Sequence, residues 1–108
     1  MMQREIRQEE KDLIAYLLEQ LPANSSQYHI PLVVKELQDG NMGSIQLTDK
    51  GRHHKDLIQM QYIDADGEKV IITLTENQAG ELFDLDMWKV DFSPLKRFPT
   101  IEQLQPSL

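Results

Sequence analysis

Residues 57–90, LIQMQYIDADGEKVIITLTENQAGELFDLDMWKV, decide the fold. Clusters of turn-forming residues interrupt this stretch at Asp64-Ala65-Asp66-Gly67 and again at Asn77-Gln78-Ala79-Gly80. The runs around these clusters are rich in β-branched, aromatic and other apolar residues: 57–63, 69–75 and 82–90. Such runs, bounded by such turns, predict three consecutive antiparallel strands.

The alternation of residues within these runs predicts which face of the sheet is buried. Side chains two residues apart on a strand point to the same side. A three-residue loop at 65–67 with a left-handed glycine, together with a two-residue turn within 78–80, brings nine apolar side chains onto one face: Ile58, Met60, Tyr62, Val70, Ile72, Leu74, Phe83, Leu85 and Met87. The opposite face is mixed and carries Gln59, Gln61, Lys69, Ile71, Thr73, Thr75, Asp84, Asp86 and Trp88.

An amphipathic helix is predicted at residues 8–21, before the strands. Its apolar side chains recur with the 3.6-residue period and form one stripe: Leu13, Ile14, Leu17, Leu18 and Leu21. Acidic residues occupy its first turns, where the helix dipole favours them, and Pro22 ends it. This stripe is the natural cover for the apolar face of the sheet.

The remaining segments complete a single domain over residues 1–108. Two short strands are expected at 32–38 and 44–48, and a polar loop at 49–55. The tail, 93–108, contains three prolines, which exclude a long element there. The predicted fold class is α+β: an N-terminal helix packed on an antiparallel sheet of about five strands, with a proline-rich C-terminal tail.

Composition narrows the classes of partner. The chain has 108 residues, 11 basic and 18 acidic side chains, a net charge of −7 and no cysteine. The charge disfavours nucleic acid, because phosphates are repelled. The absence of cysteine excludes disulfides and thiolate chemistry, and no apolar run approaches the ~18 residues that cross a bilayer. We therefore expect a cytoplasmic protein that binds neither nucleic acid nor membrane.

Motifs for cofactors and metals are missing from the sequence. Neither of the glycine-rich phosphate-binding patterns is present, nor the G-x-S-x-G pattern of a serine nucleophile. The adjacent pair His53-His54 points in two directions, which suits an exposed loop better than a metal site. Asp64 begins a stretch similar to a calcium loop, but Thr75 stands where the terminal glutamate belongs. We predict no cofactor, no metal and no catalytic residue.

A candidate recognition face remains on the third strand and its turn: Asp84, Asp86, Trp88, Asp91 and Phe92. Asp84 and Asp86 project the same way about 7 Å apart, a spacing that suits either a hydrolase carboxylate pair or a solvated sheet face. Tryptophan is frequent at binding hot spots. Alternatively, the tail folds back over Trp88 with Leu95 or Phe98 as a lid, and Asp91 anchors the following turn.

Several segments of the chain resemble a small bacterial family known only as a domain of unknown function. They are Arg7, Glu10, Leu13-Ile14 and Leu17-Leu18 in the helix, the turn Gly40-Asn41-Met42-Gly43-Ser44, the hairpin Asp64-Ala65-Asp66-Gly67, and the block DMWKVDFSPL from Asp86 to Leu95. The block around the tryptophan is the most distinctive. The resemblance implies a stand-alone bacterial domain of about this size, and it carries no activity with it.

Three functions follow from these features. The favoured one is a small acidic, non-catalytic module that binds a protein partner, because no complete catalytic constellation is present. The first alternative is a metal-dependent or carboxylate-based hydrolase that uses Asp84 and Asp86. The second is a structural homodimer joined through the mixed face or a sheet edge. The sequence is compatible with either a monomer or a homodimer.

Overall fold

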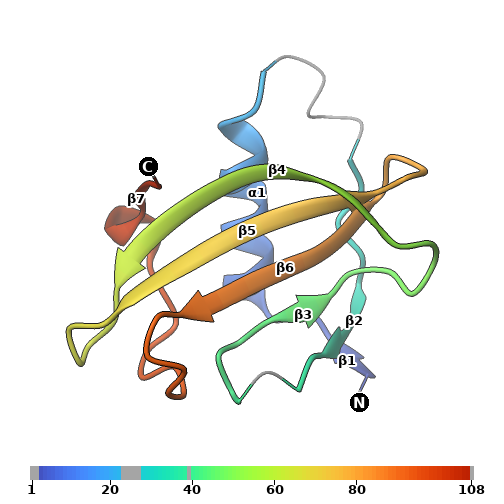
Figure 1. Cartoon of the computed structure of the whole chain (residues 1–108). Coiled ribbons are helices and arrows are strands. Elements are labelled where there is room, and N and C mark those ends of the chain that lie inside the picture. Colours follow the sequence, from blue (N-terminus) through green and yellow to red (C-terminus); the bar gives the residue numbers. More distant parts are fainter. Residues whose placement is uncertain (1–2, 23–27, 39, 108) are drawn as a thin grey trace.

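A computed structural model describes residues 3–22, 28–38 and 40–107 and shows one α-helix against a single antiparallel sheet of seven strands (Figure 1). Across the sheet, the strand order is β1-β2-β3-β6-β5-β4-β7. In chain order the elements are β1 (Gln3–Glu5), α1 (Gln8–Glu19), β2 (Val33–Glu36), β3 (Ile45–Gln46), β4 (His53–Ile63), β5 (Lys69–Asn77), β6 (Leu82–Lys89), the short 3-10 helix η2 (Ile101–Gln103) and β7 (Gln105–Pro106).

The strand count corrects the prediction of about five. The two additional strands, β1 and β7, pair at opposite edges of the sheet and have only three and two residues. Strands this short show no alternation, and a proline is tolerated in β7 because it is an edge strand. The polar loop predicted at 49–55 is also wrong in part, since β4 already begins at His53. Register shifts between His53 and Lys55 and between Asp56 and Ile58 conceal this start by breaking the alternation.

The β4–β5 hairpin has the predicted register. Tyr62 lies opposite Val70, and Met60 lies opposite Ile72. The loop has three residues, because the Asp64 amide donates to the Glu68 carbonyl at 2.9 Å. Gly67 has a φ of 87°, the left-handed conformation that such a loop requires. The apolar face of these two strands is therefore confirmed.

The β5–β6 hairpin differs from the prediction in two ways that partly cancel. Its turn has three residues instead of two, since the Asn77 amide donates to the Glu81 carbonyl at 2.9 Å. A bulge in β6 then brings Leu85 opposite Leu74, so that Leu85 and Met87 lie on the predicted apolar face. Phe83 was wrongly assigned to the buried face. The bulge leaves it half-buried, and Leu82 is buried instead.

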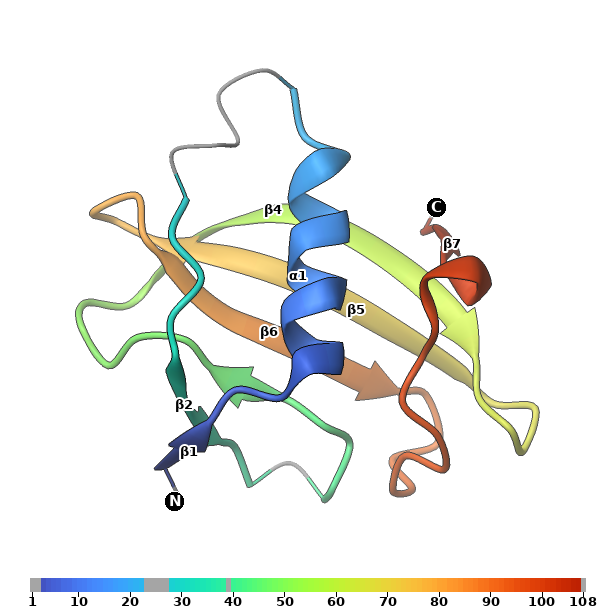
Figure 2. The ribbon, with the colours of Figure 1, turned by 180° about the vertical axis from the view of Figure 1, so that it is seen from behind.

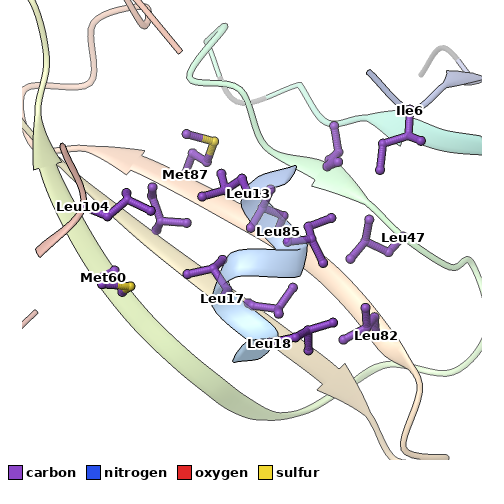
Figure 3. Close-up of a cluster of buried hydrophobic side chains, with 14 of the residues drawn as sticks. Ile6, Leu13, Leu17, Leu18, Leu47, Met60, Leu82, Leu85, Met87 and Leu104 are labelled. Carbon is purple, nitrogen blue, oxygen red and sulfur yellow. The ribbon is translucent and has the colours of Figure 1, made fainter. Parts of the chain in front are cut away.

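The core lies between α1 and one face of the sheet. Four of the five predicted helix positions are buried: Leu13, Ile14, Leu17 and Leu18. Figure 3 shows Leu13 of α1 near Leu85 and Met87 of β6, and Leu18 near Leu82. The helix ends at Glu19, two residues before the predicted end at residue 21. Burial of each such side chain stabilises the fold by roughly 1.5–3 kcal/mol, so this layer dominates stability.

The proline-rich tail runs beside α1 on the same face of the sheet (Figure 2). Leu104 joins the core, and Leu95 and Phe98 pack against it. The Tyr62 hydroxyl donates to the Arg97 carbonyl at 3.0 Å, which fixes the middle of the tail. Residues 1–2 and 108, which belong to the predicted single domain, lie outside the described residues. The tail and α1 together leave the other sheet face uncovered by any described segment.

Candidate functional site

The uncovered side of the sheet, which we call the open face, is the candidate site (Figure 1). Two cross-strand rows define it, Gln61–Ile71–Trp88 and Gln59–Thr73–Asp86. Because the tail packs on the opposite side, it forms no lid over Trp88, whose side chain is 41% exposed. The alternative in which Leu95 or Phe98 covers this tryptophan is therefore wrong. The open face has a polar end and an aromatic end.

The polar end is an open hollow of about 380 Å³. It is lined by side chains from β4, β5 and β6: His53, Asp56, Gln59, Thr73, Thr75, Asp84 and Asp86. A hydrogen bond joins Gln59 Nε2 to the Thr73 hydroxyl at 3.0 Å, and His53 Nε2 lies 2.8 Å from Asp56 Oδ1. The sequence had placed Asp84 and Asp86 here, but not His53 or Asp56, because the two register shifts in β4 hide which face these residues occupy.

Asp84 has a shifted pKa within the hollow. Burial raises the pKa of its carboxyl above the ordinary value, and the hydrogen bond from the Thr75 hydroxyl to Asp84 Oδ1, at 2.6 Å, lowers it in part. A carboxyl group with a raised pKa can hold a proton at a pH at which an ordinary carboxyl group is ionised. Together with Asp86 on the same wall, it could act as the acid of a carboxylate pair.

The aromatic end is formed by Trp88 and Phe92. Their ring centroids are 6.1 Å apart and their planes are tilted by 52°. Ile71 pairs with Trp88 across β5 and β6 and extends the apolar area. Phe92 is 67% exposed, which is unusual for a phenylalanine. An exposed aromatic pair of this kind is typical of a binding hot spot.

Phe92 also has a strained backbone. Its φ is 63°, in the left-handed region that a bulky residue rarely adopts. The turn fixes this conformation: the Phe92 amide donates to the Lys89 carbonyl at 2.9 Å. Asp91 accepts hydrogen bonds from the amide and hydroxyl of Ser93, which together lower its pKa. Asp91 thus anchors the turn in which Phe92, an exposed aromatic residue, is held in a strained conformation.

Phe92→Gly is expected to leave the melting temperature equal to that of the unchanged chain or above it. Glycine removes a left-handed cost of about 1–2 kcal/mol, which offsets the lost ring contact and the added flexibility of the unfolded chain. Circular dichroism melting measures the effect. Phe98→Gly is the control, because Phe98 packs against the core at an ordinary φ and its loss should be strongly destabilising. Equal destabilisation by both changes would contradict the strain assignment.

Lys89 lies beneath the aromatic end, on the buried face of β6. Its side chain is fully covered, and Nζ donates to Asp64 at 2.9 Å, Asp66 at 2.6 Å and the Pro94 carbonyl at 3.0 Å. The bond to the Pro94 carbonyl fixes the chain just after Phe92, at the end of its turn. Alternation along β6 assigns residue 89 to the same face as Met87, but a buried lysine is too rare to predict from that signal alone.

The predicted site residues come together only in part. Asp84, Asp86 and Trp88 share the open face along β6, and Asp91 and Phe92 follow in the turn. Within the described part of the chain, no group of three or more His, Cys, Asp or Glu side chains is arranged to hold a metal ion. Nor does that part contain a helix long and apolar enough to cross a membrane.

Comparison with known proteins gives a family and no activity. Residues 3–99 match the family model described as "Domain of unknown function (DUF6984)". This range includes β1 through β6 and the whole of the open face. No curated protein and no solved structure matches the chain. Since the match extends over most of the sequence, the chain belongs to the family DUF6984, a domain of unknown function.

Proposed function

We propose that the chain is a small acidic, non-catalytic module of the bacterial cytoplasm that binds a basic protein partner on its open face. The observation that carries the proposal is the exposed pair of Trp88 and Phe92, which the strained turn holds beside a sheet face without a cover from described residues. A rigid, solvent-facing aromatic anchor contributes binding energy with little loss of conformational freedom on association.

Charge complementarity supports a basic partner. Three carboxylates line the hollow next to the aromatic end, on Asp56, Asp84 and Asp86. The chain as a whole has a net charge of −7, so its field attracts cationic surfaces over long distances. An apolar side chain of the partner would contact Trp88, while its Lys or Arg side chains would face the carboxylates.

The test begins with partners recovered from the native host and then titrates each purified partner. Trp88→Ala is expected to weaken binding about 30-fold or more, as for a hot-spot residue. Asp86→Asn is expected to slow association and reduce its salt dependence. Glu19→Gln is the matched control, since it removes one exposed charge from α1 on the other side of the sheet.

Two results would contradict the proposal. One is a stoichiometric partner that binds the Trp88→Ala variant with undiminished affinity. The other is a homodimer, seen in sedimentation as twice the chain mass of 12.6 kDa, that dissociates in the Trp88→Ala variant. The second result would assign the open face to self-association instead.

The second candidate function is a carboxylate-based hydrolase with Asp84 as acid and Asp86 as base. The raised pKa of the Asp84 carboxyl and the hollow that it lines favour this candidate. A panel of chromogenic glycosides and esters tests it. Turnover that disappears in both Asp84→Asn and Asp86→Asn would support the hydrolase, and no turnover of any substrate in the panel would count against it.

A further inference from the structure

A second concave region lies on the side of α1, away from the open face. It is a cleft of about 290 Å³ between the start of α1, the tail, and four residues between β2 and β3, Leu37, Asn41, Gly43 and Ser44. Cationic residues from two distant segments line it, Arg7 from the helix start and Lys96 and Arg97 from the tail. Its apolar lining comes from Leu37, Leu95 and Phe98. The cleft is therefore both cationic and apolar.

The cations of the cleft are only partly neutralised. Arg4, also in the lining, is held by both oxygens of Glu10, at 2.8 and 2.9 Å, and by Glu36 at 2.6 Å. Arg7 is 3.7 Å from the already occupied Glu36, and its side chain is 56% exposed. Among the described residues, the side chains of Lys96 and Arg97 have no ion-pair partner. The lining therefore has more cationic than anionic residues, although the whole chain has a net charge of −7. The four cations are Arg4, Arg7, Lys96 and Arg97, and the three carboxylates are Glu9, Glu10 and Glu36.

The main chain, not the side chains, holds Lys96 and Arg97 in place. Their amides donate to the two oxygens of Asp64, at 2.7 and 3.1 Å, and the Arg97 carbonyl accepts from Tyr62. The charged side chains of Lys96 and Arg97 therefore extend from a fixed backbone and take no part in holding the tail. Because the backbone at both residues is already fixed, binding of an anion has only their side chains to order.

We propose that this cleft binds a small organic anion: a carboxylate or phosphate monoester that carries an apolar group. The guanidinium and ammonium groups suit the oxyanion, because arginine matches carboxylate and phosphate oxygens in pairs. The apolar lining suits the body of the ligand, and the volume is near the lower end for small-molecule sites, roughly 300 Å³. The Arg7 amide at the start of α1 is not available to the ligand, because the Glu10 carboxylate already accepts from it at 2.9 Å.

The test is a titration of the ¹⁵N-labelled full chain with phenyl phosphate, followed by NMR. Saturable shifts are expected at Gly43, Ser44 and residues 95–98, which form the cleft. Inorganic phosphate should bind at least 10-fold more weakly, because it lacks the apolar group. Benzoate, titrated separately, distinguishes a preference for carboxylates from one for phosphate esters.

Single-charge variants locate the binding. Arg97→Gln, Lys96→Gln and Arg7→Gln should each weaken phenyl phosphate several-fold and still fold, because these side chains are exposed. Lys69→Gln removes an exposed cation from β5 on the open face, on the other side of the sheet, and should leave the affinity unchanged. The proposal is overturned if neither phenyl phosphate nor benzoate gives saturable shifts, or if Lys69→Gln weakens binding as much as Arg97→Gln.

Discussion

The Ile72→Asp variant is expected to lack a cooperative folded state at room temperature. Ile72 is fully buried at the centre of the sheet, paired with Met60 on one side and Met87 on the other. The change removes about 1.5–3 kcal/mol of apolar burial and adds an unpaired carboxylate, which costs several kcal/mol more. A domain of this size has only about 5–15 kcal/mol of stability to lose. Far-ultraviolet circular dichroism against temperature measures the result.

Ile71→Asp is the matched control for this prediction. Ile71 is the adjacent residue on the same strand, but it lies on the open face and is only half-buried. The same chemical change there should leave a cooperative transition with a modestly lower midpoint. If Ile72→Asp melted like the unchanged chain, the assignment of the buried face would be wrong.

Lys89→Met is expected to lower the melting temperature by more than ~10 °C. The change preserves most of the apolar volume but leaves the buried carboxylate of Asp64 without its cation, and removes the bond to the Pro94 carbonyl. Loss of one partner of a buried ion pair is far more damaging than loss of both. Adding Asp64→Asn and Asp66→Asn to Lys89→Met should therefore recover part of the loss. Lys69→Met, an exposed lysine one strand away, should have little effect.

The same ion pairs predict how stability depends on pH. Burial alone would raise the pKa of Asp64, but hydrogen bonds from the Lys96 amide and from Lys89 outweigh burial and lower it. The pKa of Asp66 is lowered chiefly by Lys89. A carboxylate with a lowered pKa stabilises the fold at pH values above its pKa in the unfolded chain, about 4. It loses that contribution as the pH falls through its pKa in the folded state. The urea midpoint of the unchanged chain should fall below pH ~4, and more steeply than that of Lys89→Met.

Lys89 gives the complementary limit at high pH. Burial would lower its pKa, but the hydrogen bonds with Asp66 and Asp64 raise it overall. Because its pKa is raised, Lys89 makes its full contribution to stability below the pKa of the unfolded chain, about 10.4. That contribution is lost as the pH rises through the pKa of the folded state. A urea midpoint that stayed constant from pH 7 to pH 2.5 would contradict the assigned role of the three charges.

The sequence predicted the elements whose side chains alternate, and it failed where the alternation breaks. The loop at 65–67 followed from the need to keep Met60 and Tyr62 buried, and the register confirms it. The bulge in β6 could not be foreseen, because no residue in 82–85 signals an extra position, so Phe83 was misplaced. The edge strands β1 and β7 have three and two residues, too few to form a pattern.

The site was predicted to a similar extent and for the same reason. Alternation placed Asp84, Asp86 and Trp88 on one face, and the structure agrees. The contribution of His53 and Asp56 depends on two register shifts, which are properties of strand pairing and not of local sequence. The role of Lys89 depends on where the tail crosses the hairpin, a long-range contact that no short motif encodes.

The two edges of the sheet bear on how this protein behaves at high concentration. β1 and β7 have three and two residues, β7 includes a proline without an amide hydrogen, and β7 pairs with β4 only at Met60 and Gln61. The outer edge of β4 that β7 does not reach has charged side chains and two register shifts. Short, charged and irregular edges are poor templates for a further strand. The sheet can thus leave its open face uncovered without offering its edges for fibre growth.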